Sequence, residues 1–74
     1  MSRSALSHII KRLEIMQLSE SDELRRFEVD DQEKCTVRWQ AQTGLFILHD
    51  LDRDAYYYFD NLDLVAIEIY ELLG

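Results

Sequence analysis

The sequence predicts an α+β fold of two layers, in which an antiparallel meander of three or four strands carries an N-terminal and a C-terminal helix on one face. Three observations support this prediction. Apolar residues recur at helical spacing near both ends of the chain, they alternate with polar residues in the middle, and short polar turns without a linker join the segments. Four strands ~4.8 Å apart span only about two helix diameters, so the second sheet face is expected to stay uncovered in a monomer.

The first helix is expected over residues 4–18, SALSHIIKRLEIMQL. Three- and four-residue spacing places one apolar stripe along it, made of Leu6, Ile9, Ile10, Leu13 and Met16. Ser2 or Ser4 can cap its start by accepting a bond from a backbone N–H of the first turn. Ile15 falls opposite the stripe, so we expect one apolar side chain on the outer side of this helix.

Two strands are expected between residues 25 and 41, where the period changes from 3.6 to 2. In RRFEV, Phe27 and Val29 alternate with charged residues. In KCTVRWQA the alternation places four side chains on one face: Cys35, Val37, Trp39 and Ala41. Such alternation is typical of strands with one buried face. The polar run Asp30-Asp31-Gln32 is expected to form the turn between them.

The register of the next hairpin depends on the length of its loop. A three-residue loop, Gln42-Thr43-Gly44, lets Gly44 take the left-handed conformation and places Ala41 opposite Leu45. Phe46 and Leu48 then fall on the uncovered face of the sheet. A two-residue loop would exchange the two faces and bury them instead. The other pairs of the favoured register are Trp39 with Ile47 and Val37 with His49.

The last strand and the second helix follow a charged turn over residues 50–54. AYYYF (55–59) has high β propensity, and its alternation places Tyr56 and Tyr58 on the face opposite Tyr57. Asp60 or Asn61 is expected to cap the closing helix. The stripe of this helix consists of Leu62, Val65, Ala66, Ile69, Leu72 and Leu73, with Tyr70 on its margin. Leu64 and Ile67 stand outside the stripe, among acidic residues.

Residues 1–74 are expected to form a single domain near the lower limit for independent folding. A core this small seldom supplies more than ~3–5 kcal/mol of net stability without a staple or a partner subunit. Cys35 is the one cysteine, and with His8 and His49 it falls short of the four ligands of a structural zinc site. No disulfide, metal or other cofactor is therefore expected, and self-association into a homodimer is the remaining way to stabilise the fold.

The charge of the chain excludes several partners. Eight basic and fifteen acidic residues give a net charge of −7, whereas affinity for nucleic acid comes mostly from the neutralisation of phosphates. The same charge disfavours anionic membrane surfaces, and no apolar run is long enough for a signal peptide or a membrane span. We therefore expect a soluble cytoplasmic protein that binds neither nucleic acid nor membrane and shows no identifiable small-molecule ligand.

The closing stretch FDNLDLVAIEIYELL (59–73), together with the N-terminal amphipathic helix and the FEV…C.V strand pair, resembles the YkuJ-like family. This family consists of small uncharacterised proteins of low-GC Gram-positive bacteria. The resemblance covers essentially the whole chain, and its looser part rests on Phe27, Glu28, Val29, Cys35 and Val37. It implies an α+β fold with an antiparallel sheet flanked by helices, and it implies no activity and no functional residue. Residues 50–58 match no pattern of the family.

Three arrangements of reactive side chains have simpler explanations. Asp50-x-Asp52-x-Asp54 begins like a calcium loop, but Ala55 and Asn61 stand where the glycine and the bidentate glutamate are needed. In the favoured register Cys35 and His49 lie on neighbouring strands, yet Cys35 points to the apolar face, where a buried thiol is inert. Glu68 and Glu71 supply the polar side that the closing helix needs. No catalytic residue is therefore predicted.

The leading hypothesis is a non-enzymatic interaction module that self-associates as a twofold dimer. The candidate interface residues are Phe46, Leu48, Tyr56, Tyr57, Tyr58, Leu64 and Ile67. The uncovered sheet face, with Phe46, Leu48 and one pair of tyrosines, is preferred over the outer side of the closing helix because it offers more contiguous apolar area. Two alternatives stay open: an acidic adaptor that binds a protein partner as a monomer, and a small enzyme with a site at a dimer interface.

Overall fold

The computed structural model describes residues 3–19 and 24–74 and contains two helices and a four-stranded sheet. In chain order the elements are α1 (Arg3–Leu18), β1 (Leu24–Val29), β2 (Gln32–Gln40), β3 (Leu45–Asp50), β4 (Ala55–Phe59) and α2 (Leu62–Leu73). The strands lie in the order β1-β2-β3-β4, and each is antiparallel to its neighbour. The predicted α+β meander fold is confirmed, with four strands.

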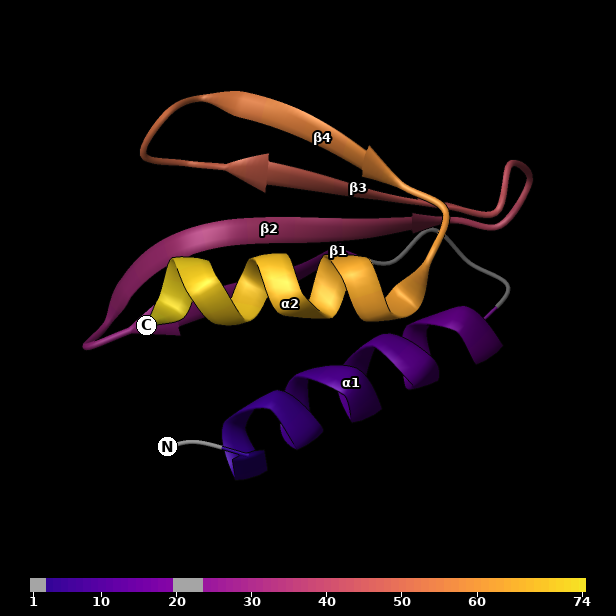
Figure 1. Cartoon of the computed structure of the whole chain (residues 1–74). Coiled ribbons are helices and arrows are strands. Elements are labelled where there is room, and N and C mark those ends of the chain that lie inside the picture. The colour runs from indigo at the N-terminus through magenta and orange to yellow at the C-terminus, as the bar shows by residue number, and fades with distance from the viewer. Residues whose placement is uncertain (1–2, 20–23) are drawn as a thin grey trace.

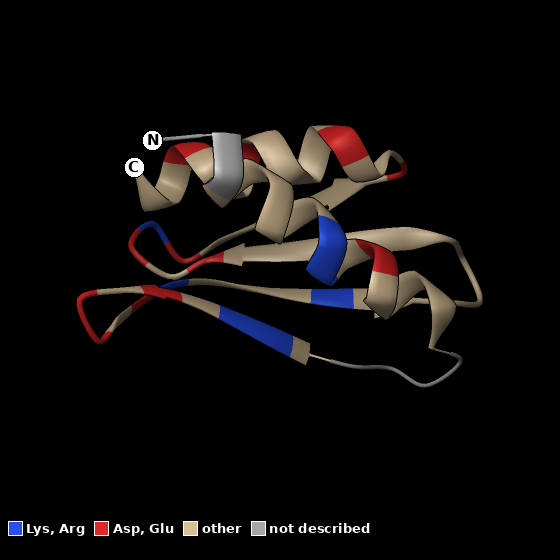
Figure 2. Ribbon diagram, turned by 90° about the horizontal axis from the view of Figure 1, so that it is seen from below, with Lys and Arg blue, Asp and Glu red and all other residues tan. Residues whose placement is uncertain are grey.

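Both helices cover the same face of the sheet (Figures 1 and 2). α2 packs against all four strands, whereas α1 packs chiefly against α2. The buried apolar residues come from both helices and from β1, β2 and β3: Ile9, Leu13, Met16, Phe27, Cys35, Val37, Phe46, Leu48, Val65, Ala66 and Ile69. One layer of side chains between sheet and helices thus forms the core, and neither helix covers the other face of the sheet.

Helix α1 follows the predicted stripe. Ile9, Leu13 and Met16 are buried, and Ile15 on the opposite side is exposed, as expected. The guanidinium carbon of Arg12 lies 4.6 Å from the centre of the Phe27 ring, a cation–π contact between α1 and β1. The proposed Ser2 cap and the side chain of Ser4 lie outside what the structure describes.

The turn between β1 and β2 is shorter than predicted. Asp30 and Asp31 alone form it, with φ angles of 54° and 66°, and Gln32 already pairs with Val29. Positive φ at both central residues is what a two-residue type I′ hairpin requires, and aspartate is among the few residues that tolerate it. The register shifts once, between Phe27 and Glu28, where a bulge bends the pair.

The predicted register of the β2–β3 hairpin is wrong by one residue. The loop has four residues, from 41 to 44, and Gln40 rather than Ala41 lies opposite Leu45. As a result Phe46 and Leu48 point into the core, with exposed fractions of 1% and 0%. The prediction that they lie on the uncovered face is therefore overturned.

Loop geometry and packing explain this register together. The backbone N–H of Gly44 donates to the carbonyl of Gln40 at 2.8 Å, and Gly44 has the predicted left-handed conformation, with φ 71°. Because side chains alternate along a strand, one added loop residue turns the whole of β3 over. The register buries Phe46, whose ring centre lies 4.7 Å from that of Trp39, and leaves the less apolar His49 outside the core.

The turn from β3 to β4 is organised by a buried carboxylate. Asp50 ends β3 and is only 1% exposed, and its Oδ1 accepts bonds from the backbone N–H groups of Asp52 (3.1 Å) and Arg53 (3.4 Å). This Asx-type turn leads directly into β4. The predicted separation of the three tyrosines is confirmed, since Tyr57 pairs with Leu48 on the core side while Tyr56 and Tyr58 pair with His49 and Ile47.

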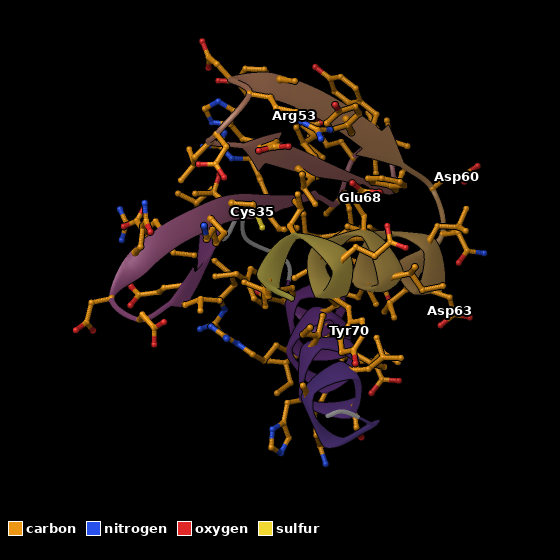
Figure 3. The ribbon with its side chains drawn as sticks, turned by 60° about the vertical axis from the view of Figure 1, so that its left-hand side comes forward. Cys35, Arg53, Asp60, Asp63, Glu68 and Tyr70 are labelled. Carbon is orange, nitrogen blue, oxygen red and sulfur yellow. The ribbon has the colours of Figure 1, made fainter. Side chains whose placement is uncertain are left out.

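Helix α2 begins as predicted. The side chain of Asn61 accepts bonds from the backbone N–H groups of Asp63 and Leu64, at 2.8 and 3.2 Å, so Asn61 rather than Asp60 is the N-cap. The predicted stripe faces the core: Val65, Ala66 and Ile69 are buried, and Leu62, Leu72 and Leu73 are partly buried. Figure 3 shows the acidic side chains of Asp60 and Asp63 at the start of this helix.

Candidate functional site: the outer face of the sheet

Two complete rows of side chains cross the face of the sheet that the helices leave open. Strand pairing aligns them residue by residue. One row is Leu24, Arg38, Ile47 and Tyr58, and the next is Arg26, Thr36, His49 and Tyr56. These eight residues, called the outer sheet face below, line a shallow depression of about 530 Å³. A depression of this size can receive side chains of another molecule.

The outer sheet face has a basic half and an aromatic half. Arg26 and Arg38 lie on β1 and β2, whereas β3 and β4 contain neither lysine nor arginine (Figure 2). The half on β3 and β4 contains Tyr56 and Tyr58, which are 58% and 64% exposed. The two tyrosines expose much of their rings to solvent, so the face combines cations with apolar aromatic surface.

The two arginines differ in their surroundings. The Nε of Arg26 lies 3.5 Å from a carboxylate oxygen of Glu33, in an exposed ion pair that contributes little to stability. Arg38 is exposed and forms no ion pair with any other residue that the structure describes. Its guanidinium is therefore available to an external anion or aromatic ring.

The aromatic half is held in place by local contacts. The rings of His49 and Tyr56 stack with their centres 4.1 Å apart and their planes 5° from parallel. The Nε2 atom of His49 also lies 2.8 Å from Oδ1 of Asp54. These contacts orient Tyr56 before any partner arrives, which reduces the entropy that binding must overcome.

The predicted interface residues are divided among four parts of the molecule. Tyr56 and Tyr58 lie on the outer sheet face, whereas Tyr57 lies on the helix side of β4 and is 37% exposed. Leu64 and Ile67 are exposed on the outer side of α2, by 54% and 47%. The buried positions of Phe46 and Leu48, described above, remove both from any interface of the folded monomer.

Of the eight residues of this face, the sequence predicts only Tyr56 and Tyr58 as interface residues. It does not predict the other six: Leu24, Arg26, Thr36, Arg38, Ile47 and His49. Arg26 and Arg38 alternate with the buried residues of their strands, so alternation already assigned them to the outer side. The missing information was the register, which sets Ile47 and Tyr58 beside Arg38 in one row.

The candidate thiol and imidazole lie on opposite faces of the sheet. His49 pairs with Thr36 on the outer side, while Cys35 is a free cysteine that is 0% exposed on the core side. Burial, and then the negative charges of Asp50 and Glu68, raise the pKa of the Cys35 thiol to about 12. Figure 3 shows its sulfur between the sheet and α2. The prediction that Cys35 lies in the core is confirmed.

The three aspartates of the β3–β4 turn point to separate partners. Asp50 binds backbone N–H groups, Asp52 lies 3.9 Å from the Nζ of Lys34, and Asp54 contacts His49. Within residues 3–19 and 24–74, no three acidic, histidine or cysteine side chains are grouped as a metal ion would require. In the same part of the chain, no helix has the length and apolar character of a membrane span.

The fold and sequence agree with known relatives. The chain is 34% identical to the uncharacterised protein YkuJ of Bacillus subtilis over 77 aligned positions, which cover 95% of this chain and 98% of the relative. The crystal structure of Bacillus subtilis YkuJ superposes with a TM-score of 0.86 at 35% identity, covering 92% of this chain and 95% of that one. This confirms the YkuJ-like resemblance. Residues 9–73 match the model of a family described as "Protein of unknown function (DUF1797)", and the chain therefore belongs to that family.

Proposed function

We propose that this protein is a non-enzymatic interaction module that self-associates as a twofold dimer through its outer sheet face. The observation that carries the proposal is the pair of cross-strand rows, which expose arginines, tyrosines, leucine and isoleucine over all four strands. Tyrosine and arginine are among the residue types that contribute most to binding at protein interfaces. A self-complementary surface of this kind suits the twofold symmetry of most homodimers.

The small size of the chain and its single layer of core favour a second copy of the chain as the molecule that binds the outer sheet face. The 74 residues form one thin layer of core under the helices, and stacking two sheets face to face would add a second layer. The outer side of α2 is the weaker candidate, because Leu64 and Ile67 offer two apolar side chains that do not line the depression.

A non-enzymatic role fits the positions of the reactive side chains. Cys35 and His49, which would form a nucleophile–base pair, are separated by the sheet itself. Asp50 is occupied by the turn that it stabilises. These positions support an outer sheet face that recognises a partner over one that activates a nucleophile.

The test is the absolute mass of the protein in solution, measured by light scattering and sedimentation from micromolar to millimolar concentration. One small sheet face buries an area at the low end of what specific protein interfaces bury. The dimer should therefore form between micromolar and millimolar protein concentration. Tyr58→Ala removes apolar area from the outer sheet face and should raise the dimer dissociation constant about tenfold or more.

Leu64→Ala is the matched control, because Leu64 is also about half exposed but lies on α2. It should leave the dissociation constant unchanged. If Leu64→Ala weakens the dimer and Tyr58→Ala does not, the interface is on α2. A wild-type protein that stays monomeric at millimolar concentration overturns the proposal and favours an adaptor that acts as a monomer.

A further inference from the structure

We propose that the twofold axis of this dimer runs parallel to the strands, between β2 and β3, so that the basic half of each copy faces the aromatic half of the other. The inference rests on the proposed self-association and adds how the second copy is oriented. It follows from the division of the outer sheet face, with Arg26 and Arg38 on β1 and β2 and the tyrosines on β4.

The rows determine which residues meet in this arrangement. Rotation about an axis along the strands places β1 of one copy over β4 of the other and keeps each row opposite itself. Arg26 then faces Tyr56 of the second copy, because both belong to the row of Thr36 and His49. In the neighbouring row, Leu24 faces Tyr58 of the second copy. Each of these contacts occurs twice in the dimer.

An axis across the strands gives the opposite result. It places β1 and β2 of one copy over β1 and β2 of the other, so that two copies of Arg26 and Arg38 share one half of the interface. Four guanidinium groups would then be desolvated near one another, and the juxtaposition of like charges opposes association. Charge therefore favours the axis along the strands.

The contact between Arg26 and Tyr56 of the second copy is chemically favourable. A guanidinium over the face of a tyrosine ring is attracted by the ring quadrupole and keeps its outer N–H groups free for water. The chain already uses this interaction inside its own fold, where Arg12 lies over Phe27 at 4.6 Å. The ring of Tyr56 is held by its stack on His49, so it presents a fixed surface.

An exchange of charge across the interface tests the orientation. Within one chain Arg26 and Tyr56 lie on the two edge strands, three strand spacings or about 14 Å apart, so their substitutions should not couple inside a monomer. Arg26→Glu should weaken the dimer, because it removes the guanidinium that is attracted to the Tyr56 ring of the second copy. Tyr56→Arg should also weaken it, because the new cation faces Arg26 of the second copy. Each single change should raise the dissociation constant roughly tenfold.

The double variant Arg26→Glu/Tyr56→Arg should restore the dimer. It places the new carboxylate of each copy opposite the new guanidinium of the other copy. The dissociation constant should then return to within about threefold of wild type, with a stronger dependence on salt. Lys11→Glu is the control for net charge, since Lys11 is exposed on α1, on the helix side of the sheet. It should leave the dissociation constant unchanged.

The possible results separate the orientation from the proposed function. If both single variants weaken the dimer and the double variant weakens it further, the sheet face is the interface but the axis does not run along the strands. If neither single variant weakens the dimer while Tyr58→Ala does, the Arg26–Tyr56 contact is absent and the orientation is wrong. If no substitution on the outer sheet face changes the mass, or if wild type is monomeric, the proposed function fails together with the orientation.

Discussion

Cys35 and Asp50 lie directly opposite each other on β2 and β3, and both side chains point into the core. The carboxylate binds the backbone of its own turn, and it raises the pKa of the neighbouring thiol, in addition to the larger effect of burial. A thiolate at this place would stand beside a second negative charge in an apolar layer, so the fold requires the neutral thiol.

Stability should therefore fall at alkaline pH. The pKa of Cys35 is raised from 9.0 to about 12 in the folded protein, so the unfolded chain loses this proton first as the pH rises. The stabilisation is complete below pH 9 and is lost between pH 9 and about 12, at a slope of about 1 kcal/mol per pH unit. Urea titrations from about pH 8 to about pH 11, which include the plateau and most of the expected decline, measure the free energy of unfolding. Cys35→Ala should lack this part of the slope; equal slopes in the two proteins would contradict the assignment.

Two neighbouring residues of β3 should respond differently to truncation. Leu48→Ala should lower the free energy of unfolding by about 2–5 kcal/mol, because Leu48 is 0% exposed and its removal leaves a cavity. Ile47→Ala should cost about 1 kcal/mol or less, since Ile47 is only partly buried, on the outer sheet face. Chemical denaturation of the monomer at low concentration measures both values. The reverse order would show that β3 adopts the register of the three-residue loop.

The N-cap of α2 should contribute measurably to stability. Asn61→Ala leaves the backbone N–H groups of Asp63 and Leu64 without their partner and should cost about 0.5–2 kcal/mol. Asn61→Asp keeps an acceptor oxygen in the same place and should cost much less. Thermal denaturation followed by circular dichroism compares the three proteins. An equal loss in both variants would mean that the cap is not what stabilises this end of the helix.

The β1–β2 turn offers a stabilising change. Asp30 and Asp31 have φ angles of 54° and 66°, which cost a residue with a Cβ about 1 kcal/mol or more. Asp31→Gly should raise the free energy of unfolding by roughly 0.5–1 kcal/mol, because glycine adopts this conformation without strain. Asp31→Ala removes the same carboxylate without relieving the strain, and it should lower stability. A melting temperature that rises in both variants would indicate charge repulsion instead of backbone strain.

Periodicity was sufficient to predict the elements of this fold and the buried faces of most of them. The stripes of α1 and α2 and the alternation of β2 depend only on spacing within one element, and the side chains lie where spacing places them. Tyr56 and Tyr58 could be assigned to a common face for the same reason, because alternation within β4 separates them from Tyr57.

The register of β3 could not be obtained in that way. Gly44 adopts a left-handed conformation that suits loops of three or four residues, so the turn signal does not distinguish between them. The strand LFILHD has large apolar residues on both faces. Which face is buried depends on how Phe46 packs against Trp39 under the helices. Such packing is a property of the assembled core, and the sequence of the strand alone does not contain it.

The burial of Asp50 was also beyond the sequence. A run rich in acidic and basic residues predicts a solvated turn, yet the first carboxylate lies 1% exposed because it accepts two backbone N–H bonds. Likewise, Arg26 and Arg38 look like ordinary surface residues until the pairing of four strands places them in rows with aromatic rings.

The packing of α1 on α2 has a consequence for the synthesis of the protein on the ribosome. α1 is made first, but the helix that covers its apolar stripe is the last element to be made. Ile9, Leu13 and Met16 therefore lack the helix that covers them until the last element is complete. A chain that lacks α2 should therefore expose the apolar stripe of α1, and such exposed surface favours aggregation or capture by chaperones.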